Sequence, residues 1–168
     1  MRFIVSTSTL LKHLQTVNGA SSSSTVLPIL ENFLFEIKEG NLTISATDLQ
    51  TSMTTSLPVE SKEEGKVAVP SRILLDTLKT LPDQPISFNI DDNTFSIEIS
   101  AGDGKYKLSG ENGDDFPKIP VVDNASSVNL PASVLAEAIT KTIFAVSNDE
   151  LRPAMTGVYC QLSPQHIT

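Results

Sequence analysis

The residues that could support catalysis do not form a recognisable catalytic set. The two histidines, His13 and His166, have no companion ligands nearby in the sequence, and the single cysteine is Cys160. Asp114 and Asp115 stand in a glycine-rich loop, but the regular spacing of a calcium-binding loop is missing. No nucleophile, base and orienting group can be assembled. The sequence therefore predicts a protein without a catalytic residue, a metal site or a cofactor.

The remaining candidates for chemistry are basic residues on predicted helices, because such residues can attract phosphate groups. They are Lys12, Arg72, Lys79 and Lys141. Arg72 and Lys79 are two helical turns apart and so share a face. Lys12 and the nearby Gln15 lie off the apolar stripe of their helix. The alternative interpretation is that all of these are ordinary solvated side chains.

The net charge at first argues against a nucleic-acid partner. The chain of 168 residues has a formal charge of −8, whereas a basic domain is the usual footprint of nucleic-acid binding. However, net charge is a sum, and a positive face can exist on an acidic body. Most acidic residues fall in predicted turns and strands, so the helices can carry such a face. The apolar content of 39% is typical of a folded protein.

Apolar periodicity predicts the helices that position these residues. Leucines and a valine recur on one face of residues 8–19, where Ser6 or Ser8 can cap the start and Gly19 can adopt a left-handed conformation after the end. A second helix is predicted over residues 72–81, where Leu81-Pro82 ends it.

Alternating apolar and polar residues predict the strands. Their expected ranges are 2–5 (a possible edge strand), 30–37, 42–47, 49–59, 66–69, 86–90, 95–99 and 105–109. The connections are too short for parallel crossovers, so the predicted fold class is α+β with antiparallel sheets.

The sequence begins to repeat itself after residue 121. At a constant offset of 125 residues, Pro28 aligns with Pro153 and Leu42 with Ile167. The same offset aligns Leu10 with Leu135 in a third predicted helix. Because the same offset applies to both a helix and a hairpin, it indicates a structural repeat. We therefore expect two domains, 1–121 and an incomplete 122–168, with strands at 127–130 and 156–162 and Cys160 buried. The second domain should be mobile, exchanged with a neighbouring copy, or packed against one in a crystal.

Six segments together identify a family. In order, they are MRFIVS, LLKHLQTV, TVLPILENFLFE, SATDLQTSM, VPSRILLDTLKTLP and GDDFPKIP. No single segment is a catalytic signature, but all six occur in order at the right spacing. The chain resembles the bacterial replicative sliding clamp, the beta subunit of DNA polymerase III.

The resemblance implies a sliding-clamp fold, with two helices and antiparallel sheets in each domain. A complete subunit has three such domains, and two subunits join head to tail in a ring around duplex DNA. The ring is not an enzyme. It tethers the polymerase III core, and the clamp loader and other proteins bind it too. The present chain would be an N-terminal fragment of a cytoplasmic bacterial protein. The alternative is an adaptor with the same duplicated fold that does not bind DNA.

The resemblance also assigns roles to particular residues. The DNA-facing positions are Lys12, Gln15, Ser24, Arg72, Lys79, Lys141 and Asp149. Ser24 and Asp149 depart from the family, which has arginine and glutamine there, so weaker or differently placed loop contacts with DNA are expected.

Two protein-binding surfaces are implied as well. Lys105, Tyr106 and Leu108 would belong to the edge strand at the dimer interface, although Tyr106 and Leu108 could instead fill the core. Arg152 and Met155 would line a small part of the pocket that binds partner peptides. No apolar run approaches the length of a membrane span.

Overall fold

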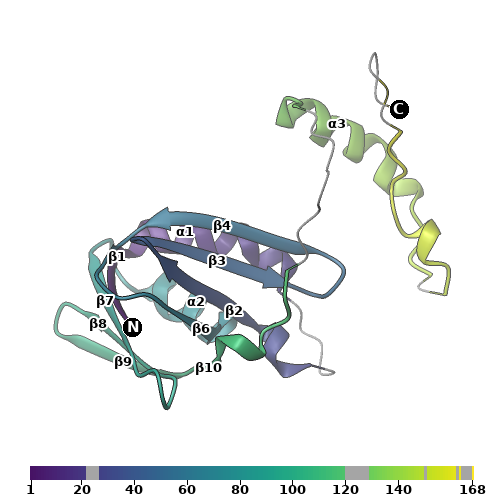
Figure 1. Ribbon diagram of the computed structural model, residues 1–168. Helices are drawn as coiled ribbons and strands as arrows, with labels where there is room; N and C mark the ends of the chain where they lie inside the picture. Colours follow the sequence, from purple (N-terminus) through teal and green to yellow (C-terminus); the bar gives the residue numbers. More distant parts are fainter. Residues whose placement is uncertain (22–26, 120–128, 150, 162, 164–167) are drawn as a thin grey trace. The chain divides into compact units, whose positions relative to one another are not determined.

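The computed structural model describes residues 1–21, 27–119, 129–149, 151–161, 163 and 168. The chain divides into two units, Met1–Pro120 and Val121–Thr168. Figure 1 shows the helices and strands of both units.

The first unit contains two five-stranded antiparallel sheets, which confirms the predicted α+β class. One sheet has the order β5-β1-β7-β8-β9 and the other the order β10-β6-β2-β3-β4. The strands of the first sheet are β5 (Glu60–Ser61), β1 (Arg2–Ser6), β7 (Pro85–Ile90), β8 (Ser96–Ala101) and β9 (Gly104–Ser109). Those of the second are β10 (Glu111–Asn112), β6 (Gly65–Pro70), β2 (Asn32–Lys38), β3 (Asn41–Thr47) and β4 (Ser52–Pro58).

Strand β1 is not an edge strand, because it pairs with both β5 and β7. The sequence did not predict β5 or β10, which are only two residues long each. Short strands of this kind carry too few alternating residues to give a signal. The long hairpin between β2 and β3 turns at Glu39 and Gly40, with φ angles of 49° and 74°. Positive φ at both central residues is typical of a type I′ turn in a two-residue hairpin loop.

Two helices complete the first unit. Helix α1 (Thr7–Val17) buries Leu10, Leu14 and Val17, and helix α2 (Ser71–Thr80) buries Leu74, Leu75 and Leu78. The prediction for Gly19 was wrong: the helix continues as a short 3-10 helix, η1 (Asn18–Ala20), and Gly19 does not have a positive φ.

The apolar faces of the helices and of both sheets meet in one core. At its centre, the rings of Phe3 and Phe88 stack with centroids 4.6 Å apart. Phe35 approaches both rings from the other sheet, at 6.4 and 6.3 Å. This core fixes the sheets against each other, so the exposed helix faces have a rigid support.

The second unit repeats the local structure of the first at the offset of 125 residues. Helix α3 (Ala132–Thr142) corresponds to α1 residue for residue, and η4 (Ile143–Ala145) corresponds to η1. The 3-10 helix η5 (Pro153–Met155) corresponds to the start of η2 (Pro28–Glu31). Gln161 and Thr168 exchange both backbone hydrogen bonds, at 2.7 and 3.0 Å. Their counterparts, Glu36 and Thr43, pair in the β2–β3 hairpin.

The apolar side chains of helix α3 that correspond to the buried leucines of α1 are exposed. Leu135 and Ile139 are 42% and 38% exposed, whereas Leu10 and Leu14 are fully buried. None of the described residues between 156 and 161 belongs to a strand, and Cys160 is exposed, so both predictions were wrong. The physical reason is that a strand needs a neighbouring strand to pair with. In the described part of this unit, the single residue Thr168 is all that pairs with this segment. Of the strand expected at 127–130, residues 127 and 128 lie outside the described residues.

Candidate nucleic-acid interface

Helix α1 presents a polar face opposite its buried leucines. Lys12 and Gln15 are both exposed there. Lys12 has no ion-pair partner among the described residues, so its charge is available to a ligand. The start of the helix is held by Asp83, whose carboxylate accepts hydrogen bonds from the Ser6 hydroxyl at 2.8 Å and the Ser8 backbone N–H at 3.2 Å.

Asp83 therefore acts as the N-terminal cap that the sequence assigned to a serine. Neither Ser6 nor any other helix residue caps α1 through its own side chain. Hydrogen bonds from the Ser8 hydroxyl, the Ser6 hydroxyl and the Ser8 backbone lower the pKa of the Asp83 carboxyl below its ordinary value. A negative charge at a helix N-terminus is also favourable to the helix dipole.

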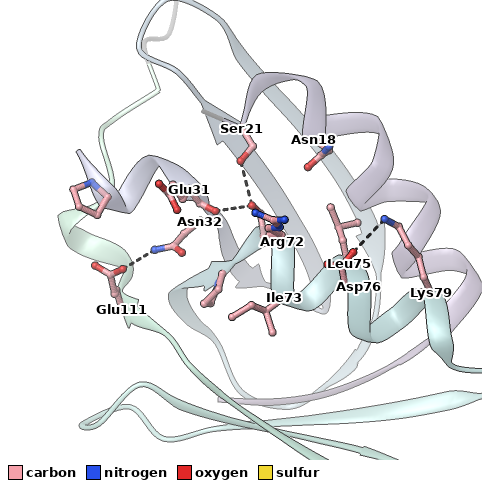
Figure 2. Close-up of a pocket in the computed structure, with 13 residues that line it drawn as sticks. Asn18, Ser21, Glu31, Asn32, Arg72, Ile73, Leu75, Asp76, Lys79 and Glu111 are labelled. Atoms are coloured by element: carbon pink, nitrogen blue, oxygen red, sulfur yellow. Dashed lines mark hydrogen bonds and ion pairs between the residues drawn. The ribbon is translucent and has the colours of Figure 1, made fainter. Parts of the chain in front are cut away.

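Arg72 and Lys79 lie on one face of α2, as their spacing predicted, and both line the same cavity (Figure 2). The cavity has a volume of about 780 Å³ and is bordered by α2, η1, η2 and β10. Figure 2 shows that Lys79 points toward Asp76, and the Nζ–Oδ1 distance is 3.4 Å. Arg72 has no ion-pair partner in the described part of the chain.

A hydrogen-bonded frame holds the other side of this cavity (Figure 2). The Asn32 amide donates to Glu111 at 2.8 Å, and the Ser71 hydroxyl donates to the Glu31 carbonyl at 2.6 Å. Ser71 also lies 3.2 Å from the Ser21 hydroxyl. This frame fixes the first turn of α2, which carries Arg72. No local sequence pattern indicates this frame, because its members are far apart in the chain.

Lys141 on α3 is neutralised by its own helix. Its Nζ lies 2.6 Å from the Glu137 carboxylate, one turn earlier. Glu137 occupies the position that Lys12 has in the first unit, at the offset of 125 residues. Asp76 and Glu137 are thus acidic residues on helices, and of the four basic candidates only Lys12 and Arg72 lack an acidic partner within the described residues.

Two of the residues predicted to face DNA, Ser24 and Asp149, belong to loops. Ser24 lies outside the described residues. Asp149 is exposed and organises a turn: its carboxylate accepts the Leu151 N–H at 3.1 Å, and its carbonyl accepts the Arg152 N–H at 3.1 Å. The Met155 N–H in turn donates to the Arg152 carbonyl at 2.8 Å. Arg152 and Met155 are both exposed.

Strand β9 has an unpaired edge, because it ends its sheet. Lys105 and Lys107 are exposed and lie 3.5 and 3.9 Å from the Glu98 carboxylate. Tyr106 and Leu108 are half-buried and pack against the core. Each of these two side chains therefore contributes to the core and leaves part of its surface exposed at the sheet edge.

Other polar residues have structural roles. The Asp48 carboxylate accepts the Thr51 and Gln50 backbone N–H groups at 2.6 and 2.9 Å, which lowers its pKa. It closes the turn before β4. No cluster of potential metal ligands occurs among the described residues, including Asp114 and Asp115. In the same part of the chain, no helix is both long and apolar enough to cross a membrane.

Comparison with known proteins agrees with this duplicated α+β architecture. The family model of the DNA polymerase III beta subunit, N-terminal domain, matches residues 1–120. The chain therefore belongs to the DNA polymerase III beta subunit family. It is 29% identical to the beta sliding clamp of Halalkalibacterium halodurans, over all of this chain and 46% of that protein. It is 31% identical to the beta sliding clamp of Staphylococcus epidermidis, over 94% of this chain and 44% of that protein.

Solved structures of proteins in this family are also similar to the chain. The DNA polymerase sliding clamp from Bacillus subtilis is 25% identical with a TM-score of 0.90, covering 96% of this chain and 44% of that one. The DNA polymerase III beta subunit of Caulobacter crescentus is 27% identical with a TM-score of 0.88, covering 95% and 44%. The present chain thus spans somewhat less than half the length of these relatives.

Proposed function

We propose that this chain is the N-terminal part of a DNA sliding clamp subunit. Residues 1–121 form the first clamp domain and residues 122–168 begin the second. The family match over residues 1–120 supports this division. So does the repetition of α1 and η1 by α3 and η4 at one constant offset.

The proposed role is to hold a replicative polymerase on duplex DNA without any catalysis by the clamp itself. Such a ring must attract phosphates without reading the base sequence, so that it can slide. The observation that carries this proposal is the placement of Lys12 and Arg72. Both stand exposed on helices, without an acidic partner in the described part of the chain. The protein would act in the bacterial cytoplasm, at replication forks on the nucleoid.

Removal of both charges tests the DNA-binding face. For a Lys12→Ala, Arg72→Ala double variant, we expect weaker binding to a short duplex. The slope of log K against log salt should also be shallower by about 1.8, since each lost phosphate contact changes the slope by about 0.9. A matched control is Lys38→Ala, Lys62→Ala, which removes the same charge from exposed positions outside the helices. An equal loss of affinity in both variants would show that only net charge matters.

The loop contacts to DNA are expected to be weaker than in other family members. Ser24 is neutral, Asp149 repels phosphate, and Lys141 is paired with Glu137. We therefore expect Ser24→Ala to change DNA affinity much less than the Lys12, Arg72 double substitution. An equally large effect of Ser24→Ala would contradict this part of the proposal.

We further propose that the β9 edge joins two subunits head to tail in a complete clamp. An unpaired edge strand is a template for pairing with another strand. In a complete subunit, Tyr106→Ala with Leu108→Ala should shift sedimentation from dimer to monomer. Lys107→Ala is the control, because this exposed side chain lies on the same strand near Glu98 and is not one of the proposed interface residues. A stable dimer in the first variant, with its fold intact by circular dichroism, would exclude this interface.

Arg152 and Met155 are proposed to form part of the pocket through which the polymerase III core, the clamp loader and other proteins bind. Methionine suits an adaptable apolar site. Most of the pocket lies beyond this chain, so we expect no useful binding of a hydrophobic clamp-binding peptide here. A micromolar dissociation constant by calorimetric titration would contradict that expectation.

An adaptor that does not bind DNA is the second candidate. The observation in its favour is that Asp76 and Glu137 neutralise two of the four helix lysines and arginines, on a chain with a charge of −8. The two functions differ in the duplex titration: an adaptor shows no salt-dependent binding and no effect of the Lys12, Arg72 substitution.

A further inference from the structure

A groove between α1 and β4 is built from hydrogen-bonding side chains. It has a volume of about 540 Å³, and its lining residues are Ser8, Thr9, Lys12, His13, Thr16 and Thr55. No carboxylate lines it. A concave site with hydroxyl groups, a lysine and an imidazole has the composition expected for an oxyanion ligand.

The contacts within the groove leave particular donors free. The Thr16 hydroxyl donates to the Lys12 carbonyl at 3.0 Å, which turns its proton away from a ligand. Nδ1 of the half-buried His13 lies 2.7 Å from the Thr55 hydroxyl, 42 residues further along the chain. This bond fixes the orientation of the ring and leaves Nε2 without a partner among the described residues. The Thr9 hydroxyl and the Lys12 ammonium group are likewise unpaired there.

The charges around His13 are few. Lys12 is the only other charged residue on α1, and the packed strands β3 and β4 carry none. Asp83 binds Ser6 and Ser8 at the N-terminal end of the groove, so an acidic group lies beside it. The charged residues of α2 line the separate cavity with Asn18. Arg2 on β1 lies in another cavity with Glu60 and Glu63.

We propose that this groove binds one backbone phosphate of duplex DNA, through Lys12, Thr9 and, when its ring carries a second proton, His13. The inference rests on the proposed function, in which α1 faces DNA. Imidazole side chains in general change charge between about pH 5 and pH 8. A protonated ring donates from Nε2 to the phosphate while Nδ1 donates to Thr55. DNA binding therefore gains one charged contact on the acidic side of neutrality.

The test measures duplex affinity at pH 6 and pH 8 at one ionic strength, for the wild-type chain and His13→Gln. Glutamine can keep a hydrogen bond to Thr55 but does not titrate. We expect the wild type to bind about threefold more tightly at pH 6 than the variant does, with equal affinities at pH 8. The NMR signals of the His13 ring should also move on addition of duplex at pH 6.

Three outcomes would overturn the inference. If duplex shifts signals around Arg72 but not His13, and His13→Gln keeps the wild-type ratio of affinities, the groove is not a phosphate subsite although the proposed function stands. If inorganic phosphate moves the His13 signals and duplex does not, the groove binds small anions only. If the wild type binds no duplex at either pH, the proposed function and the inference fail together.

Discussion

The two copies of the repeat allow the same substitution to be made in a covered and an uncovered helix. Leu10 and Leu135 occupy equivalent positions of α1 and α3, yet Leu10 is fully buried and Leu135 is 42% exposed. Truncation of a fully buried leucine to alanine leaves a cavity and costs about 3 kcal/mol. The same truncation at a site as open as Leu135 should cost less than about 1 kcal/mol, because solvent already reaches the side chain.

Urea denaturation followed by far-ultraviolet circular dichroism measures the difference. With a slope of about 1.5 kcal/mol/M, Leu10→Ala should lower the transition midpoint by about 2 M. Leu135→Ala should lower it by much less. Leu27→Ala provides a matched control, since Leu27 in the first unit is 41% exposed. The reasoning is refuted if Leu135→Ala destabilises the protein as strongly as Leu10→Ala, because α3 would then be covered as α1 is.

Two further predictions concern the first unit. Asp83→Ala removes the carboxylate that caps α1, and hydrogen bonds hold the pKa of this carboxyl below its ordinary value of 3.8. Because the folded pKa is depressed, the stabilisation is present above about pH 3.8 and is lost as pH falls through the lower folded value. The melting temperature of the variant should therefore lie below that of the wild type at pH 7, and the gap should close in strong acid; a constant gap would contradict the capping role. Gly110→Ala places a methyl group 2.9 Å from the carbonyl oxygens of Ala68 and Phe95, so it should destabilise by about 1–3 kcal/mol in thermal melts. Gly157→Ala, which meets nothing within 4 Å, should be neutral, and equal effects of the two would refute this steric account.

The helices and strands of the first unit were largely predictable, because the sequence patterns that indicate them are local. The spacing of Leu10, Leu14 and Val17 fixes the buried face of α1, and Gly40 marks the tight turn between β2 and β3. The expectation for Gly19 failed because a helix can continue in 3-10 form without a left-handed residue. A glycine permits such a residue but does not require it.

The candidate nucleic-acid interface could be predicted only in part from the sequence. The pairs Asp76–Lys79 and Glu137–Lys141 have helical spacings that could have been recognised from the sequence. In contrast, Asp83 caps a helix 75 residues before it, and Thr55 meets His13 across 42 residues. Contacts of this kind depend on the tertiary fold, so no local pattern indicates them. The exposure of Cys160 likewise depends on which strands are available to cover it.

The most direct test of the account is a map of the duplex-binding surface on the isotope-labelled chain. Two duplexes of unrelated sequence are titrated at low and moderate salt while the backbone amide signals are followed by NMR. We expect the same shifts with both duplexes, centred on Lys12, Gln15 and Arg72 and weakened by salt. An absence of shifts, or shifts centred on the β9 edge and absent from α1 and α2, would contradict it.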